Sequence, residues 1–165
     1  MKVDSKDWEI LEVLENNSRL RYEQVGAMLD LETAEVEKRV REMEEKRIIV
    51  KYHTLVNWEK AGSQTVSALI EVKVTPQRGS GFDNIAERIY RFPEVKTVYL
   101  MSGSYDISVL IEGKTMKEVA FFVATKLATI EDVQATATHF VLKKYKQEGI
   151  ILEDKEEDRR LVISP

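Results

Sequence analysis

The sequence predicts an α+β chain of two domains, an N-terminal winged helix-turn-helix and a C-terminal ferredoxin-like domain of order βαββαβ. Apolar residues recur at helical spacing in three short segments within residues 4–46, as in a tri-helical unit. From residue 66 they alternate with polar residues, which is typical of a half-buried strand. Strand and helix patterns then follow one another in split-βαβ order. We expect a helix-turn-helix domain at 1–52, a linker at 53–63, the second domain at 64–146 and a tail at 147–165.

The first domain is expected to contain three helices and one strand. Residues 4–15, 21–29 and 33–46 carry apolar side chains at helical spacing, and Asp4 can cap the first helix. The turn between the second and third helices is short, as a helix-turn-helix requires. Residues 47–52 are rich in β-branched and aromatic side chains, which predicts a strand and therefore a winged variant.

The second domain is expected to form a sheet with helices on one face only. Strands are predicted at 66–74, 95–101, 105–112 and 132–146, and helices at 83–91 and 115–127. An uncovered apolar sheet face favours association with a second copy of the chain. A twofold dimer would also present two recognition helices to two half-sites on DNA. The side chains expected on the uncovered face are Leu69, Leu110, Phe140 and Leu142.

Composition excludes several classes of function. The 165 residues include no cysteine, which rules out disulfides and thiolate metal sites. No apolar run is long enough to cross a bilayer and the first residues do not form a signal peptide, so we expect a cytoplasmic protein without a membrane partner. No carboxylates at metal-binding spacing accompany His53 or His139, and no nucleophile elbow is present. We therefore expect neither a metal nor an enzyme.

The third helix is the candidate DNA-reading element. Such a helix presents polar side chains to base edges, while cationic side chains nearby bind phosphates. Residues 1–60, however, hold 11 basic and 14 acidic residues, and an ordinary solvated helix is an equal alternative on pattern alone. The expected DNA-binding residues are Arg19, Arg21, Thr33, Ala34, Glu37, Lys38, Arg39 and Arg41.

A glycine turn in the second domain is the candidate small-molecule site. The run 98–107 reads as a strand, a turn at Gly103 and a second strand. Backbone amides at such a turn can bind a carboxylate and Asp106 can accept from an amine, so an amino acid would fit. On the residues alone a plain hairpin is favoured, with Gly103 at positive φ and Asp106 bonded to turn amides.

Both halves resemble one family of regulators, the Lrp/AsnC (leucine-responsive/asparagine regulator) family. The run 100–106 and the strand 136–144 are similar to its RAM domain (regulation of amino-acid metabolism), and the resemblance covers about residues 4–146. Arg21 and Glu32 depart from the serine helix caps of the family, and Asp30 replaces its turn glycine. In the first domain the matching residues are Asp4, Asp7, Ile10, Leu11, Leu14, Asn17, Ser18, Arg19, Val25, Leu31, Val36, Arg39, Val40, Met43, Glu44, Ile48, Ile49, Ala61 and Gly62.

The resemblance implies a sequence-specific transcription regulator whose third helix enters the major groove of double-stranded DNA. It also implies a RAM domain that forms homodimers, commonly assembled into octamers, with a small effector, expected to be an amino acid, between protomers. Effector binding would shift the assembly state. The alternative is a ligand-sensing oligomer of the same fold that has lost or weakened direct DNA binding, which the acidic third helix favours. The implied effector residues are Met101, Gly103, Ser104, Tyr105 and Asp106, with Thr136 and Thr138 from a neighbouring chain.

Overall fold

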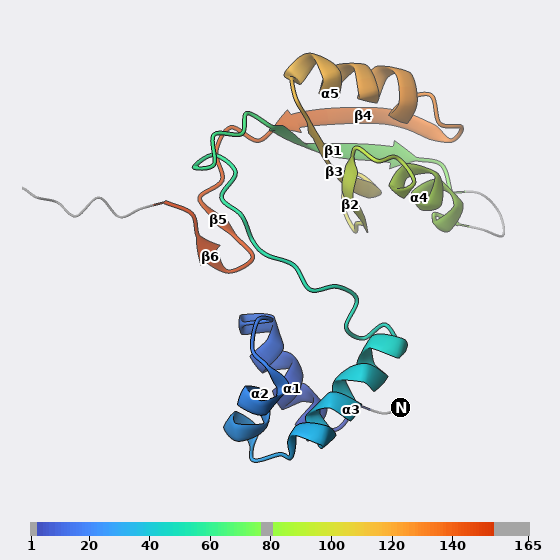
Figure 1. Ribbon diagram of the computed structural model, residues 1–165. Helices are drawn as coiled ribbons and strands as arrows, with labels where there is room; N and C mark the ends of the chain where they lie inside the picture. Colours follow the sequence, from blue (N-terminus) through green and yellow to red (C-terminus); the bar gives the residue numbers. More distant parts are fainter. Residues whose placement is uncertain (1–2, 77–80, 154–165) are drawn as a thin grey trace, which may run out of the picture. The chain divides into compact units, whose positions relative to one another are not determined.

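The computed structural model describes residues 3–76 and 81–153 (Figure 1). Contacts divide the chain into two compact units, residues 1–55 and 56–165. Within the described part of both units, no helix is long and apolar enough to cross a membrane.

The N-terminal unit contains the three predicted helices: α1 (Ser5–Asn16), α2 (Tyr22–Leu29) and α3 (Thr33–Glu45). Each helix turns an apolar stripe inward, because side chains three and four residues apart share one helix face. The stripes meet in one core, which confirms the helical spacing found in the sequence. The buried apolar residues are Ile10, Leu14, Val25, Val36, Val40 and Met43.

Left-handed residues end both helices of the turn motif. Asp30 follows α2 with φ 54°, and Arg47 follows α3 with φ 55°. After α3 the Arg47 amide donates to the Glu44 carbonyl at 2.9 Å and the next amide to the Met43 carbonyl at 2.8 Å. This pair of bonds is a Schellman cap, which usually places glycine at the left-handed position. Both helix ends are therefore closed by hydrogen bonds even though neither position is glycine.

The strand predicted at 47–52, and with it the wing, is wrong. Within the described residues these six form turns and irregular chain. Side chains such as Ile48 and Ile49 favour an extended backbone, but a strand also needs a neighbouring strand to pair its amides and carbonyls. Here the amides of both residues donate instead to the Met43 carbonyl, at 2.8 and 3.2 Å.

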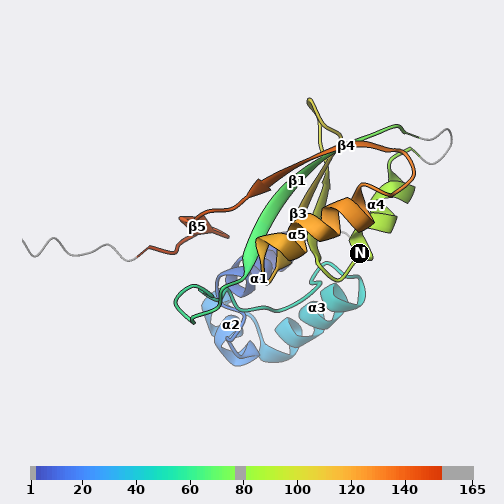
Figure 2. The same ribbon diagram turned by 90° about the horizontal axis from the view of Figure 1, so that it is seen from above.

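The C-terminal unit is a four-stranded antiparallel sheet with helices on one face (Figure 2). The sheet order β2-β3-β1-β4 is that of the predicted ferredoxin-like fold. Both helices share one buried core with the sheet, and α5 continues as a π-helix, η1. The elements are β1 (Val66–Val74), α4 (Asp83–Tyr90), β2 (Val95–Leu100), β3 (Ile107–Gly113), α5 (Met116–Phe122), η1 (Val123–Leu127) and β4 (Val133–Phe140).

Strand register assigns each side chain to a face. Ile70, opposite Val109 in β3, is buried beneath the helices, whereas Leu69, opposite Leu110, lies on the uncovered face as predicted. Phe140 pairs with the buried Ala68 and packs against the core, so its predicted place on the uncovered face is wrong. Opposed residues in an antiparallel pair point to the same side of the sheet. Leu142, also predicted there, follows the end of β4 and is 89% exposed.

The last strand is shorter than predicted. It ends at Phe140, opposite Ala68 in β1, and the following Val141 amide donates to the Ser67 carbonyl at 2.9 Å. A small hairpin follows, formed by β5 (Lys146–Gln147) and β6 (Ile150–Ile151). Its two-residue loop has positive φ at both positions, as in a type I′ turn. The rest of the predicted tail, 154–165, lies outside the described residues.

Candidate DNA-binding surface and effector turn

One exposed face of α3 collects half of the predicted DNA-binding residues. Ala34, Glu37, Lys38 and Arg41 stand at positions i, i+3, i+4 and i+7 and line one shallow surface. All four are exposed. The structure therefore brings these residues together on a single helix face that a DNA groove could contact.

The charges on this face are mixed. Arg41 is paired with Glu37 at 2.8 Å, and both side chains are at least half exposed. Glu42 and Glu45 line the same surface, whereas Lys38 has no ion-pair partner in the part of the chain described. An exposed pair of this kind is weak and can exchange partners in solution. Lys38 is thus the cation most readily offered to a phosphate, and Arg41 must first leave Glu37.

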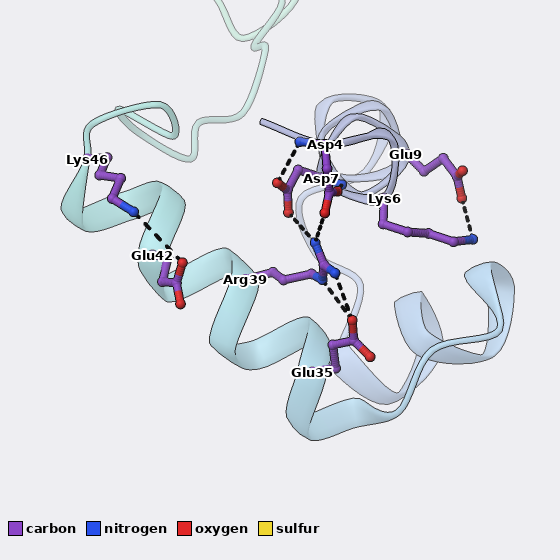
Figure 3. Close-up of polar contacts among 8 residues, drawn as sticks. All are labelled: Asp4, Lys6, Asp7, Glu9, Glu35, Arg39, Glu42 and Lys46. Carbon is purple, nitrogen blue, oxygen red and sulfur yellow. Dashed lines mark hydrogen bonds and ion pairs between the residues drawn. The ribbon is translucent and has the colours of Figure 1, made fainter. Parts of the chain in front are cut away.

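Arg39 lies on a different side of α3 and is held by carboxylates (Figure 3). Its Nη1 donates to Asp4 Oδ2 at 2.8 Å and to Asp7 Oδ1 at 2.9 Å, and its Nε donates to Glu35 Oε1 at 2.9 Å. Asp7 is fully buried, and the Arg39 side chain is only 22% exposed. These bonds fasten the middle of α3 to the first turn of α1.

The same two aspartates cap α1. The Asp7 amide donates to Asp4 Oδ1 at 2.9 Å, and the Asp4 amide donates to Asp7 Oδ2 at 3.0 Å. Hydrogen bonding from Arg39 lowers the pKa of Asp4, and the bonds from Asp4, Asp7 and Glu35 raise the pKa of Arg39. The sequence alone did not predict this cluster. The one local signal for it is two aspartates at capping-box spacing before an apolar helix.

The other predicted DNA contacts lie at the starts of α2 and α3. Arg19 and Arg21 are exposed in the turn before α2. Thr33 is the first residue of α3 and is partly buried. Arg21 and Glu32 stand where the family usually has a serine cap, and neither caps its helix through a side chain. Gln24 compensates in part, since its Oε1 accepts from the Arg21 amide at 2.9 Å.

The glycine turn connects β2 to β3, and the predicted residues Met101, Ser104 and Tyr105 lie in it. The Met101 amide donates to the Asp106 carbonyl at 2.8 Å, closing the loop. Gly103 has φ 149°, a left-handed value that favours glycine. Met101, Gly103 and Ser104 are exposed, whereas Tyr105 and Asp106 are partly buried.

Asp106 binds the end of β1 rather than the turn. Its Oδ2 accepts from the Val74 amide at 2.9 Å, which differs from the plain-hairpin expectation of bonds to turn amides. Lys73 Nζ stands 3.5 Å from the same oxygen and donates to the Ser104 carbonyl at 3.3 Å. The turn thus carries an ammonium group beside a carboxylate. The sequence alone did not predict a role for Lys73, whose place is set by the register of β1 with β3.

Two predicted effector residues lie elsewhere in the unit. Thr136 pairs with Val72 and Thr138 with Ile70, so both point to the helix-covered face. They belong to β4, which is at the opposite edge of the sheet from β2. The structure of one chain does not bring them to the glycine turn. In residues 3–76 and 81–153, no three histidine, aspartate or glutamate side chains gather where they could hold a metal ion.

Known proteins match both units. Residues 3–44 match the AsnC-type helix-turn-helix domain, and residues 67–151 match the Lrp/AsnC ligand binding domain. The chain is 48% identical over 166 residues to an uncharacterized HTH-type transcriptional regulator, YugG, of Bacillus subtilis, and the match covers 100% of both. It is 28% identical to the HTH-type transcriptional regulator FL11 of Pyrococcus furiosus, across 88% of this chain and 93% of the relative.

Solved structures have the same fold. B. subtilis LrpC is 27% identical with a TM-score of 0.65, covering 88% of this chain and 99% of its own. The regulator NMB0573 of Neisseria meningitidis, solved as a complex with L-Met, is 25% identical with a TM-score of 0.72, covering 88% of this chain and 94% of its own. Both full-length relatives are named as transcriptional regulators. The matches to both domains and to a full-length relative agree. The chain therefore belongs to the Lrp/AsnC family of helix-turn-helix transcription regulators.

Proposed function

We propose that this regulator binds double-stranded DNA as a homodimer through α3 and that an amino acid bound near the glycine turn controls the assembly. The observation that carries the proposal is the exposed face of α3, where Ala34, Lys38 and Arg41 share one surface of a complete helix-turn-helix. Recognition helices of this motif place such residues against base edges in the major groove.

The roles of the DNA-binding residues follow from their surroundings. Lys38 and Arg41 supply phosphate-binding cations on the exposed face of α3, and Arg19 and Arg21 in the turn before α2 supply further phosphate contacts. Thr33 and Ala34 stand at the start of α3, which enters the groove first in this motif. The Glu37 carboxylate accepts a hydrogen bond from the amino group of cytosine once Arg41 has left it to bind the DNA. Arg39 positions α3 through α1.

The uncovered sheet face supports the homodimer. Leu69 is 37% exposed on that face, and Leu110 opposite it is partly buried. Apolar side chains at the centre of an uncovered sheet are stabilised when a second sheet packs on them. Two copies joined in this way carry two α3 helices, as a pseudo-palindromic operator requires.

The effector proposal rests on the charges at the turn. Lys73 Nζ and the Asp106 carboxylate lie side by side, and they complement the carboxylate and the ammonium of an amino acid. Gly103 leaves the turn backbone open, since nothing lies within 4 Å of the place where a Cβ would be. NMB0573, solved with L-Met, supports an amino acid as the effector class.

The first test is selection of DNA fragments by the purified full-length protein at low and near-physiological salt. Wild type is compared with a Lys38→Ala/Arg41→Ala variant and with a matched control, Arg88→Ala/Lys117→Ala, which removes two exposed cations from the C-terminal unit. We expect a pseudo-palindromic site with wild type and control but not with the α3 variant. On that site, the loss of two phosphate-binding cations would lower the salt slope by about 1.8 per chain.

A DNA selection that enriches no site would contradict the DNA-binding proposal. If a folded wild-type oligomer enriches no site at either salt, with or without added amino acids, the DNA-binding proposal is wrong. The acidic residues of α3 would then favour the alternative, a ligand-sensing oligomer of the same fold. Calorimetric titration with L-Met and other amino acids tests the effector separately, with Lys73→Met as the variant expected to lose binding.

A further inference from the structure

A cavity with a volume of about 260 Å³ lies in the C-terminal unit where β3 passes into α5. Its walls are mainly apolar, and Ile111, Val119, Phe121 and Phe122 supply them. Figure 2 shows α5, drawn in orange, lying across the sheet at this place. Pockets for drug-sized ligands are usually somewhat larger, so this one suits a small molecule. It lies at the end of β3 that is farthest from the glycine turn.

Only one of the two carboxylate oxygens of Glu94, which lines the cavity, has a hydrogen-bond partner in the described structure. Glu94 Oε1 accepts from Lys126 Nζ at 2.5 Å. Although 32% of the Glu94 side chain is exposed, its Oε2 atom is buried and has no hydrogen-bond partner in the described structure. The bond from Lys126 lowers the pKa of Glu94, so the carboxylate is charged at neutral pH. A charged oxygen shielded from both water and a donor is unfavourable, and a ligand that donates to it would remove this penalty.

The surroundings of Glu94 favour a cation. The Lys126 ammonium already lies 5.6 Å from the ring centroids of both Phe92 and Phe122, a cation–π arrangement. Glu118 lines the same cavity, with its Oε2 accepting from the Lys114 amide at 2.8 Å. Glu112 is a third carboxylate in the lining, so an anionic ligand would meet three carboxylates and the negative faces of aromatic rings.

The helix changes its winding beside the cavity. Val123–Leu127 is a π-helix, in which the Ala128 amide donates to the Val123 carbonyl at 2.8 Å. Such segments in α-helices are rare, carry a cost in stability and are frequent at functional sites. Phe121 precedes this segment and Lys126 lies within it, and Phe121 is 66% exposed at the cavity wall. An exposed aromatic ring next to an irregular helix is an independent indication of a binding site.

We propose that this cavity binds small apolar primary ammonium ions. The Glu94 carboxylate turns so that Oε2 accepts from the ammonium, and the hydrocarbon packs against Ile111, Val119 and Phe121. The site differs from the glycine turn in its place in the fold and in its mainly apolar walls. It therefore does not depend on the proposed effector function.

The test is a titration of the full-length protein, labelled at Ile and Val methyl groups, with 3-methylbutylammonium, followed by NMR. For so small a ligand we expect a Kd of about 1–10 mM, with shifts centred on Ile111 and Val119. The neutral isostere 3-methylbutanol should bind about tenfold more weakly, because it lacks the charge that pairs with Glu94. Glu94→Gln should weaken the ammonium ion by a similar factor and leave the alcohol unchanged.

The controls keep the outcome interpretable. Glu87→Gln removes an exposed carboxylate from α4, where it pairs with Arg91, and should leave binding unchanged. If Glu94→Gln fails to fold, Phe121→Ala replaces it as the test variant, since that exposed ring can be removed without opening the core and its loss should weaken binding several-fold. Equal binding of ammonium ion and alcohol, or no shift at these two methyl groups up to about 50 mM, would overturn the proposal.

Discussion

Replacing Arg39 by Met tests whether this residue is a structural clamp or a phosphate contact. Methionine keeps an unbranched side chain and favours the helix about as well as arginine. The change removes three hydrogen bonds to Asp4, Asp7 and Glu35. The buried Asp7 carboxylate then keeps the Asp4 amide, 3.0 Å away, as its one donor in the described structure.

The size of the effect is set by Asp7. Removing one partner of a buried ion pair costs about 3–5 kcal/mol, because the remaining charge stays buried. Arg39 is itself 22% exposed, so water can partly replace it, and we expect a loss of about 2–4 kcal/mol. The bond to the 43% exposed Glu35 contributes less than about 0.5 kcal/mol of this. A domain this small rarely has more than about 3–5 kcal/mol of stability, so the variant would be close to unfolding.

The assay is urea unfolding of the full-length protein, followed through the NMR amide signals of α1, α2 and α3. Arg41→Met is the matched control, since it removes an exposed i,i+4 pair and should cost less than about 0.5 kcal/mol. Adding Asp7→Asn to Arg39→Met removes the buried negative charge of Asp7, which has lost its ion-pair partner. We expect the double variant to be about 2 kcal/mol more stable than the sum of the single changes predicts.

One combination of results would refute this reasoning. Suppose that Arg39→Met unfolds at the same urea concentration as Arg41→Met, but binds operator more weakly and with a salt slope smaller by about 0.9 per chain. Arg39 would then be a phosphate contact, and its bonds to the three carboxylates would contribute nothing to stability.

Three further changes have defined outcomes. A Cβ at Gly26 would lie 2.6 Å from the Leu31 carbonyl oxygen, so Gly26→Ala should destabilise the helix-turn-helix by about 1–3 kcal/mol in urea. Ile70→Ala, in the core of the sheet, should cost about 2–5 kcal/mol, with a smaller loss indicating that the core collapses around it. Arg39 lowers the pKa of Asp4 below its ordinary 3.8. The ionised Asp4 carboxylate therefore stabilises the N-terminal unit above that pH, and this stabilisation is lost as the pH falls through the pKa of Asp4 in the folded protein. Urea midpoints measured between about pH 5 and about pH 2 should therefore fall more steeply in wild type than in Asp4→Asn, which keeps a capping side chain but cannot ionise, and equal slopes would contradict the assignment.

Periodicity predicted the fold where burial imposes it. The spacing of Val36, Val40 and Met43 located α3, because only one helical face can enter a three-helix core. The alternation through Ile70 and Val72 likewise located β1 and its buried face. Phe140 was misplaced because β4 alternates Ala, Thr, His and Phe, so neither side of the strand is clearly apolar. Its face depends on the register with β1, which local sequence does not contain.

The candidate sites were predictable only in outline. Helical geometry gathered Ala34, Lys38 and Arg41 on one surface, as the sequence indicated. The partner that distinguishes Arg39 from them is Asp7, 32 residues earlier in the chain, and no local pattern connects the two. Lys73 reaches the glycine turn for a similar reason, through a pairing of strands distant in sequence. Tertiary contacts decide which of several exposed cations remains available to a ligand.

The left-handed residues Asp30 and Arg47 have a thermodynamic consequence for α3. Because hydrogen bonds close the chain on either side of it, the helix does not have to lengthen or fold when it meets a binding partner. No ordering of backbone then opposes binding, so the helix is preorganised. The heat capacity change on association should reflect only the surface buried at the interface, without the large negative contribution of a segment that folds as it binds.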